Sequence, residues 1–409
     1  MPHSEPLNTA TSCIEVVPLP ALERLNTLLG AEVKLAPGGD LDHLSSDDEK
    51  KLVDALHEHS VLVVRRAGIK HPSTMTALCR IFDKDALDMH SYGKTAVREK
   101  TNVLSRNNAG RLKGDPNVVV IGNGFYENYD GGEDLQLRHV TQAEFHAKPL
   151  TEAELADGQT RFYRWHLDAP LYERYPGKVT IISCQETPGY LPDQKIVFED
   201  GSVKSVYPGG TAYVSGARAF SLLTPEEKEW AMNTRVQYAP RAYNWIGDCK
   251  ATSDGLTIES EGKERDFDSM EPWTWDKAHC YPLVFRNPGK PSRPHLIALG
   301  CCVYSLITTD PRTGKETTIS DFGEARKKIH SLMKRSMSDR YVYVHRYEPD
   351  DLVIWHNRAV WHSITGELGN SKRLMWQAAN GSPYAPQAAQ WDEVDIEGKT
   401  WAMDMCVGV

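Results

Sequence analysis

The chain lacks an apolar run of the roughly 20 residues that a helix needs to span a bilayer. Its first twenty residues also lack the basic start and apolar core of a secretory signal. We therefore expect no membrane partner. No stripe of Lys and Arg offsets the net charge of -9, and this argues against a nucleic-acid partner.

Cysteine patterns that hold zinc or perform redox chemistry are missing as well. The eight cysteines are scattered, none form a CxxC pair, and only Cys301 and Cys302 are neighbours. We expect reduced, mostly buried thiols and a cytoplasmic location, with disulfides as the less favoured alternative.

The chain has the size and composition of a soluble globular protein. It contains 409 residues, of which 40% are hydrophobic and 25% are charged. Without repeats or low-complexity linkers, we expect a surface extension at 1–44, one main domain at 45–385 and a C-terminal extension at 386–409. Residues 246–280 are polar and broken by Gly, Ser and Asp, so we predict an insertion or lid there.

Helical signals are concentrated in the first part of the chain. Ser46 to Glu49 reads as a capping box, followed by apolar residues at helical spacing to about residue 59. A second amphipathic pattern covers 75–82. Later helices are predicted to open at Thr224 and to run over 321–336.

Strand signals predominate in the rest of the chain, and no alternation of strand and helix appears. This favours a mainly β (α+β) fold, an antiparallel double-stranded β-helix or jelly roll with flanking helices. Strands are predicted at 60–66, 118–124, 178–186, 210–216, 234–240, 295–306, 340–347, 351–357, 360–364 and 372–378.

The sequence RFYRWHLDAPLY offers His166 and Asp168 as metal ligands. Residues i and i+2 of a strand point to the same face, so both can bind one ion. Two histidines in DLVIWHNRAVWHSI compete as a third ligand, and we favour His362 over His356, which stands at a turn. Two imidazoles and one carboxylate occupy one face of a ferrous ion and leave three positions open.

Arg373 follows His362 by eleven residues, in a strand where Arg373 and Gln377 share one face. A buried cation needs an anion. The anion is either a protein carboxylate or the far end of a dicarboxylate such as 2-oxoglutarate, which guanidinium holds bidentately. Beside a three-ligand set we favour 2-oxoglutarate. Thr211 either adds a hydroxyl to this contact or is an ordinary strand residue.

WHLDAPLY, the GGT turn, DLVIWHNRAVWHS and the later arginine together resemble the TauD/TfdA family over roughly residues 45–380. The resemblance implies a double-stranded β-helix that uses Fe(II), 2-oxoglutarate and O2, with ascorbate as reductant. It also implies a small-molecule substrate and allows a homo-oligomer. By this match the iron ligands are His166, Asp168 and His362, and the 2-oxoglutarate contacts are Arg373 and Thr211.

Within the family, YAPRAYNW and HNR are most similar to a fungal branch that includes xanthine dioxygenase. Gln377 stands where sulfonate-oxidising relatives have a second arginine, which argues against a sulfonate. Gln377 also matches xanthine-oxidising relatives, but Ala379 replaces an asparagine, and Leu155 replaces the second acid after Glu154. We therefore favour another small polar metabolite, such as an amino acid in specialised metabolism, over conversion of xanthine to urate.

Three side chains are predicted to contact this substrate: Gln377, Glu154 and Arg164. Arg164 shares the face of His166 by alternation, with a structural salt bridge as its alternative. Oxidation of a C–H bond there leads to hydroxylation, desaturation or ring closure. The competing classes are a catalytically silent small-molecule-binding protein and a zinc hydrolase, in which Arg373 has no evident task.

Overall fold

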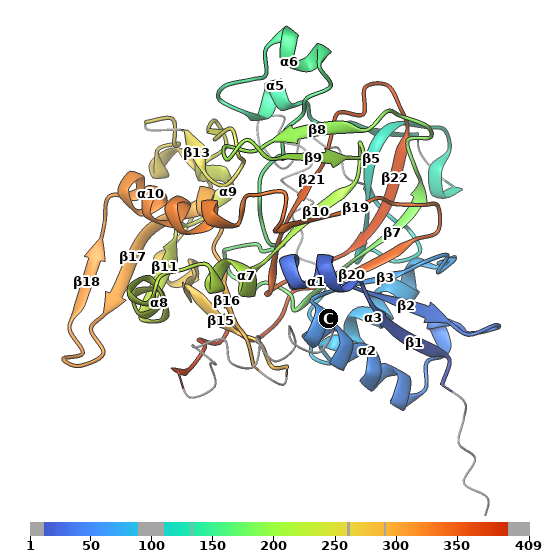
Figure 1. Ribbon diagram of the computed structural model, residues 1–409, viewed down its shortest axis with the longest axis horizontal. Helices are drawn as coiled ribbons and strands as arrows, with labels where there is room; N and C mark the ends of the chain where they lie inside the picture. The colour runs from blue at the N-terminus through green and yellow to red at the C-terminus, as the bar shows by residue number, and fades with distance from the viewer. Residues whose placement is uncertain (1–11, 89–109, 132–133, 260–261, 290–291, 392–409) are drawn as a thin grey trace, which may run out of the picture.

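The structure is a computed structural model that describes residues 12–88, 110–131, 134–259, 262–289 and 292–391. A nine-stranded sheet dominates the right half of Figure 1. Only β2 and β3 pair in parallel, and the other neighbours are antiparallel. Its order is β1 (Ile14–Pro18), β2 (Ala31–Leu35), β3 (Val61–Val64), β20 (Leu352–His356), β7 (Val179–Glu186), β22 (Arg373–Ala378), β5 (Val118–Tyr126) and β4 (Gly110–Arg111), with β6 (Leu135–Leu137) on β5.

A second, three-stranded sheet closes the jelly roll. Its antiparallel order is β19 (Val342–His345), β10 (Thr211–Ser215) and β21 (Val360–Ile364). Buried side chains from the two sheets form one cluster, which includes Trp355 and Tyr213. The predicted double-stranded β-helix is therefore confirmed, and its interior lies between these sheets.

Two helices cover the outer face of the large sheet: α2 (Ser46–His59) and α3 (Pro72–Phe82). The N-cap of α2 is Ser45, whose Oγ accepts from the N–H of Asp48 at 3.2 Å. The predicted capping box was therefore wrong by one residue. The reason is that Ser45 has extended backbone angles, whereas Ser46 is already helical.

A second core lies on the left of Figure 1, around a four-stranded sheet. The strands are β14 (Cys280–Pro282), β11 (Thr234–Tyr238), β17 (Val303–Thr309) and β18 (Glu316–Ile319), and the helices beside them are α7 (Gly216–Ser221), α8 (Pro225–Met232), α9 (Ala242–Trp245) and α10 (Phe322–Met333). The strand predicted over 295–306 is split into β16 (Pro294–Leu296), η6 (Gly300–Cys302) and β17.

The remaining described elements are short. They are α1 (Ala21–Thr27), η1 (Leu41–His43), η3 (Tyr129–Gly131), α5 (Gln142–Phe145), α6 (Glu152–Ala156), β8 (Gln194–Val197), β9 (Val203–Val206), β12 (Lys250–Ala251), β13 (Ile258–Glu259), η4 (Phe267–Ser269), η5 (Trp275–Lys277), β15 (Val284–Arg286) and η7 (Lys334–Ser336).

One domain prediction needs correction, and for another the structure favours one of its two alternatives. The segment expected as a surface extension supplies β1 and β2, and its Ala31 and Val33 are fully buried in the core. A strand added to a sheet edge buries alternate side chains. The many Pro, Leu and Gly residues of 1–40 indicated a surface segment instead, so the two strands were not predicted. The described part of 246–280 also packs into the second core, and its Glu264 forms a buried ion pair with Arg326 of α10. This region is an integral insertion and not a free lid.

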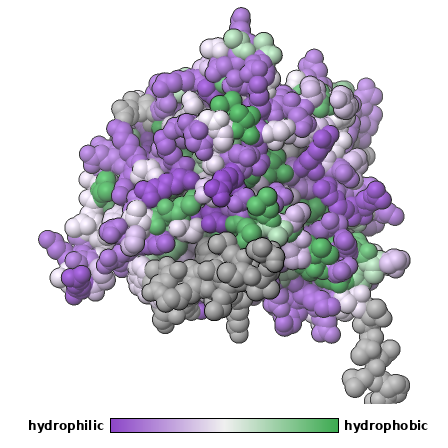
Figure 2. Space-filling model, in the orientation of Figure 1, coloured by the Kyte–Doolittle hydropathy of each residue, from purple (hydrophilic) through white to green (hydrophobic). Residues whose placement is uncertain are grey.

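The surface in Figure 2 is mostly hydrophilic, with hydrophobic residues in small groups. No helix within the described ranges is both long and apolar enough to cross a bilayer. None of the seven cysteines in these ranges forms a disulfide, and five of them are buried.

Candidate metal and co-substrate site

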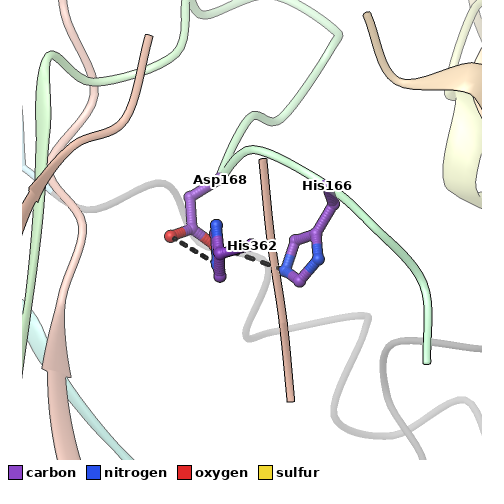
Figure 3. A group of neighbouring side chains, drawn as sticks. All are labelled: His166, Asp168 and His362. Carbon is purple, nitrogen blue, oxygen red and sulfur yellow. Dashed lines mark ion pairs between the residues drawn. The ribbon is translucent and has the colours of Figure 1, made fainter. Parts of the chain in front are cut away.

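His166, Asp168 and His362 form a compact cluster between the sheets (Figure 3). His166 Nε2 lies 3.9 Å from Asp168 Oδ1, and His362 Nε2 lies 3.6 Å from Asp168 Oδ2. Two atoms that each bind one ion at about 2 Å stand no more than about 4 Å apart. These two separations therefore suit three ligands of a single ion.

Backbone pairing places the two histidines side by side. The segment with His166 is not the strand that the motif predicted; it forms one isolated antiparallel bridge with His362 of β21. The N–H of His166 donates to the His362 carbonyl at 3.1 Å, and the reverse bond measures 2.9 Å. Because of this bridge the ring centroids lie 4.2 Å apart.

His362, and not the competing His356, is the histidine that the fold brings to this cluster. His362 faces the interior from β21, directly across from Tyr213 of β10. His356 ends β20, and its ring lies 5.7 Å from that of His57. The choice made from the sequence between these two residues therefore agrees with the geometry of the cluster.

Burial keeps both imidazoles neutral. Loss of solvent lowers the pKa of His166 to about 3, and the neighbouring His362 and Arg164 act in the same direction. Burial likewise lowers the pKa of His362 to about 3, again helped by Arg164. His166 Nδ1 donates to the Arg164 carbonyl at 2.9 Å, so its Nε2 lone pair faces the cluster. Neutral imidazoles of this kind are ready to bind a cation.

The carboxylate of Asp168 is held by two side chains. Its Oδ2 accepts from Thr180 Oγ1 at 2.8 Å and from Gln377 Nε2 at 3.3 Å. Burial raises the pKa of Asp168, while His166 and the Thr180 bond oppose the rise. A bound cation would relieve this burial cost, because it favours the ionised carboxylate.

Arg373 is buried on the inner face of β22, with 2% of its surface exposed. Its Nε donates to the Gly209 carbonyl at 2.9 Å. Within the described ranges no acidic side chain forms an ion pair with Arg373, so the internal salt bridge considered above is not seen there. Gly209 has φ +80, and a Cβ at this position would lie 2.8 Å from Arg373 Cδ. The chain therefore keeps a close-packed cation that an anionic ligand can pair.

Tyr347 connects the two predicted co-substrate contacts, and reasoning from the sequence missed it. Its hydroxyl lies 3.0 Å from Thr211 Oγ1, and the guanidinium of Arg373 lies 6.0 Å from its ring centre. The only signal in the sequence was its place two residues beyond His345, in the alternation of VYVHRY.

The three predicted substrate contacts have different surroundings. Gln377 reaches Asp168 as described, and Arg164 is buried with its guanidinium 5.2 Å from the ring centre of Tyr243. Glu154 lies on α6, at the top of Figure 1, and its carboxylate accepts from the N–H and hydroxyl of Thr151, both at 2.7 Å. This acid caps a helix, so we correct the prediction and leave Glu154 out of the proposed substrate site.

The chain matches the family described as "Taurine catabolism dioxygenase TauD, TfdA family" over residues 18–379. It belongs to the TauD/TfdA family. As a member, it is an Fe(II)- and 2-oxoglutarate-dependent dioxygenase that acts on a small molecule. The cluster and the buried arginine described above fit the cofactors that the family implies.

Curated relatives cover most of the chain. An alpha-ketoglutarate-dependent xanthine dioxygenase of Schizosaccharomyces pombe is 32% identical over 94% of this chain and 92% of its own length. The corresponding enzyme of Emericella nidulans is 33% identical over 83% of this chain and 90% of its own. An alpha-ketoglutarate-dependent dioxygenase of Alternaria brassicicola is 25% identical over 86% of this chain and 91% of its own.

Solved structures share the fold at lower identity. A taurine dioxygenase from Burkholderia xenovorans aligns with TM-score 0.51 and 16% identity, over 92% of this chain and 95% of that one. AAD-2 in complex with Mn(II) and N-oxalylglycine aligns with TM-score 0.50 and 15% identity, over 92% and 100%. These likenesses support the jelly-roll fold alone.

Proposed function

We propose that this dioxygenase oxidises a C–H bond of a small polar metabolite at the cluster of His166, Asp168 and His362. The observation that carries the proposal is the pairing of this three-ligand set with Arg373, a buried cation without an acidic partner in the described ranges. When bound, iron and 2-oxoglutarate would activate O2, which is the oxidant for the C–H bond.

The protein's own side chains bind the metal ion and orient 2-oxoglutarate. The two neutral imidazoles and the Asp168 carboxylate hold the ion, and Thr180 fixes the carboxylate rotamer. Arg373 holds the 5-carboxylate of 2-oxoglutarate bidentately, with the hydroxyl pair of Thr211 and Tyr347 beside it. Burial of Arg373, Thr211 and Tyr347 keeps water from this end of the site, which strengthens the contact with a carboxylate.

The substrate is the finer part of the proposal, and we infer an amino-acid-like molecule. Ala379 lacks the polar group that holds a purine in the relatives that the sequence resembles. The next amide along, Asn380, is committed elsewhere, because its Nδ2 donates to the Leu87 carbonyl at 3.0 Å. Hydroxylation, desaturation and ring closure all remain within this proposal, and a homo-oligomeric state stays a prediction.

Xanthine is the second candidate. It is favoured by the 32–33% identity to relatives named xanthine dioxygenases, over 83–94% of the chain. Under this reading a purine is held without a polar group at residue 379, and Gln377 remains beside Asp168.

The test is succinate release from 2-oxoglutarate with Fe(II), O2 and ascorbate, across a panel of free amino acids and purines. Release with an amino acid and none with xanthine supports the first candidate. Release with xanthine alone supports the second. Silence with every compound, together with tight binding of one of them, would favour a catalytically silent binding protein.

A further inference from the structure

A single segment, which we call the ligand segment, contacts the backbone of both residues of the HxD motif and carries the third ligand of the proposed site. It consists of β20 in the large sheet, the turn at 357–359 and β21 in the three-stranded sheet. Its strand β21 bridges His166, and the turn contacts Asp168 through the side chain of Asn357. The positions of all three proposed ligands therefore depend on one element.

The amide of Asn357 is fully buried and uses three bonds. Its Oδ1 accepts from the N–H of Asp168 at 2.8 Å. Its Nδ2 donates to the carbonyls of Asp168 at 2.7 Å and of Gly177 at 3.0 Å. One partner needs an acceptor and the other two need donors, so this amide has only one orientation that satisfies them.

Asp168 needs such a partner because it lies in a bend outside any strand. Buried backbone N–H and C=O groups are costly when unpaired. Asn357 pairs with both groups of Asp168, as the peptide group of a neighbouring strand would. It therefore fixes the backbone that carries the carboxylate, while Thr180 and Gln377 fix the carboxylate itself.

We propose that Asn357 is a positioning residue for the metal site, acting through the backbone of Asp168. This inference rests on the proposed function, because it assumes that Asp168 is an iron ligand. Residues that orient ligands from outside the coordination sphere change metal affinity by about 10- to 100-fold. We expect a loss of that size for Asn357→Ala.

The neighbouring contacts provide a matched control. Asn380 is also a buried asparagine, and its Nδ2 donates to the Leu87 carbonyl at 3.0 Å without touching a proposed ligand. Asn380→Ala removes a buried amide that makes one hydrogen bond where Asn357 makes three, so it reports the cost of losing a buried amide away from the proposed ligands. Asn357→Asp keeps the shape and the acceptor for Asp168 N–H but removes both donors.

The experiment measures Fe(II) affinity of the purified full chain without oxygen, together with the visible absorption of its Co(II) complex. Thermal unfolding of each variant checks the fold. We expect Asn357→Ala and Asn357→Asp to lower Fe(II) affinity at least about tenfold and to change the Co(II) spectrum. Asn380→Ala should leave both readouts unchanged. If Asn357→Ala does not fold, Asn357→Asp carries the comparison.

Wild-type affinity and an unchanged Co(II) spectrum in a folded Asn357 variant would overturn the inference. Equal losses in the Asn357 and Asn380 variants would also overturn it, because the effect would then be one of general stability. Absence of Fe(II) binding in the wild type is a different result: it rejects the proposed metal site, and the role of Asn357 with it.

Discussion

At the scale of the residue, the buried guanidinium of Arg373 has the largest electrostatic consequence. A buried charge without a counter-charge is costly, and burial lowers the pKa of this group. The surrounding groups in contact are neutral: the Gly209 carbonyl and the ring of Tyr347. An anion that enters here gains a charge-assisted bidentate contact and removes the cost of the unpaired charge.

Arg373→Ala should therefore weaken 2-oxoglutarate binding by about 100-fold, which corresponds to about 3 kcal/mol for a charge-assisted contact. Arg373→Lys should have a 2-oxoglutarate affinity between those of the wild type and Arg373→Ala, because lysine keeps the charge but not the two parallel N–H donors. Anaerobic titration of the Fe(II)-loaded protein with 2-oxoglutarate measures this. Arg346→Ala, at an exposed ion pair with Asp193, is the control. Unchanged affinity in Arg373→Ala removes its assigned role.

The choice of third ligand is testable at the same scale. His362→Ala should abolish Fe(II) binding and succinate formation, because it removes one of three atoms that converge within 4.8 Å. His356→Ala should retain Fe(II) binding, since that ring lies beside His57 instead. Equilibrium binding of Fe(II) to the two variants decides the matter, and the reverse pattern would transfer the ligand role to His356.

At the scale of the element, the turn at 252–257 supports the HxD segment from behind. The carbonyl of Gly255 accepts from Trp165 N–H at 2.9 Å. Gly255 has φ +75, and a Cβ there would lie 1.7 Å from the Tyr163 carbonyl oxygen. Asp254 of this turn meets His330 of α10 at 2.7 Å, so α10 anchors the support of the HxD segment.

This ion pair predicts a pH dependence of stability. The bond raises the pKa of His330, so its contribution is fully present below the unfolded value near 6.5 and is lost as pH rises through the folded pKa. The pKa of Asp254 is lowered by the same partner despite its burial, so its contribution is present above 3.8 and is lost at lower pH. Two further charges act on His330: Lys334 opposes its protonation, and Glu199, the ion-pair partner of Lys334, favours it.

His330→Gln should therefore be destabilised at pH 6 and lose less stability than the wild type between about pH 6 and 8. Urea unfolding at a series of pH values measures the difference. Asp254→Asn should likewise reduce the change in the free energy of unfolding between about pH 6 and 8. Parallel curves for wild type and both variants would show that the pair does not couple stability to pH.

Sequence patterns predicted the elements whose signals are local. The β-branched runs of β7 and β20 gave strands close to the observed bounds. The break between β16 and β17 was missed because it depends on a distant contact: a Cβ at Gly300 would lie 2.5 Å from the Leu256 carbonyl oxygen. Such a close approach leaves no periodic trace in the sequence.

The residues of the candidate site also fall into two groups: those that local motifs indicate, and those that depend on contacts between distant parts of the sequence. The three ligand positions follow from short motifs with fixed spacing, so they were predictable. Tyr347 reaches Thr211, and Asn357 reaches Asp168, only through side-chain contacts between segments that are more than 100 residues apart in the chain. Glu154 was predicted as a substrate contact because it stands twelve residues before His166 in the sequence. Its spacing from Thr151 is that of a capping box, and this local signal describes its role in the structure.

At the scale of the whole molecule, the first described strands are structural parts of the domain. β2 shields the edge of β3 through a parallel pairing, and β3 in turn pairs with β20 of the ligand segment. An uncovered apolar edge strand is an aggregation site. The stability of the proposed site therefore extends to the N-terminal strands.

Deletion of residues 1–36 should consequently lower solubility and the urea midpoint, because Ala31 and Val33 leave the core and β3 gains a free edge. Deletion of residues 1–11, ahead of β1, is the control and should have little effect on either. A soluble protein with an unchanged urea midpoint after the longer deletion would restore the surface extension that the composition had indicated.

The pairing of β3 with β20 also orders events during synthesis. Residues 61–64 leave the ribosome early, and their antiparallel partner at 352–356 emerges only near the end of translation. Domains that form by such distant pairing cannot close on a partial chain. The nascent polypeptide would expose His166 and Asp168 long before His362 exists. The three proposed ligands can therefore come together only when the chain is nearly complete, so metal binding at this site follows the synthesis of residue 362.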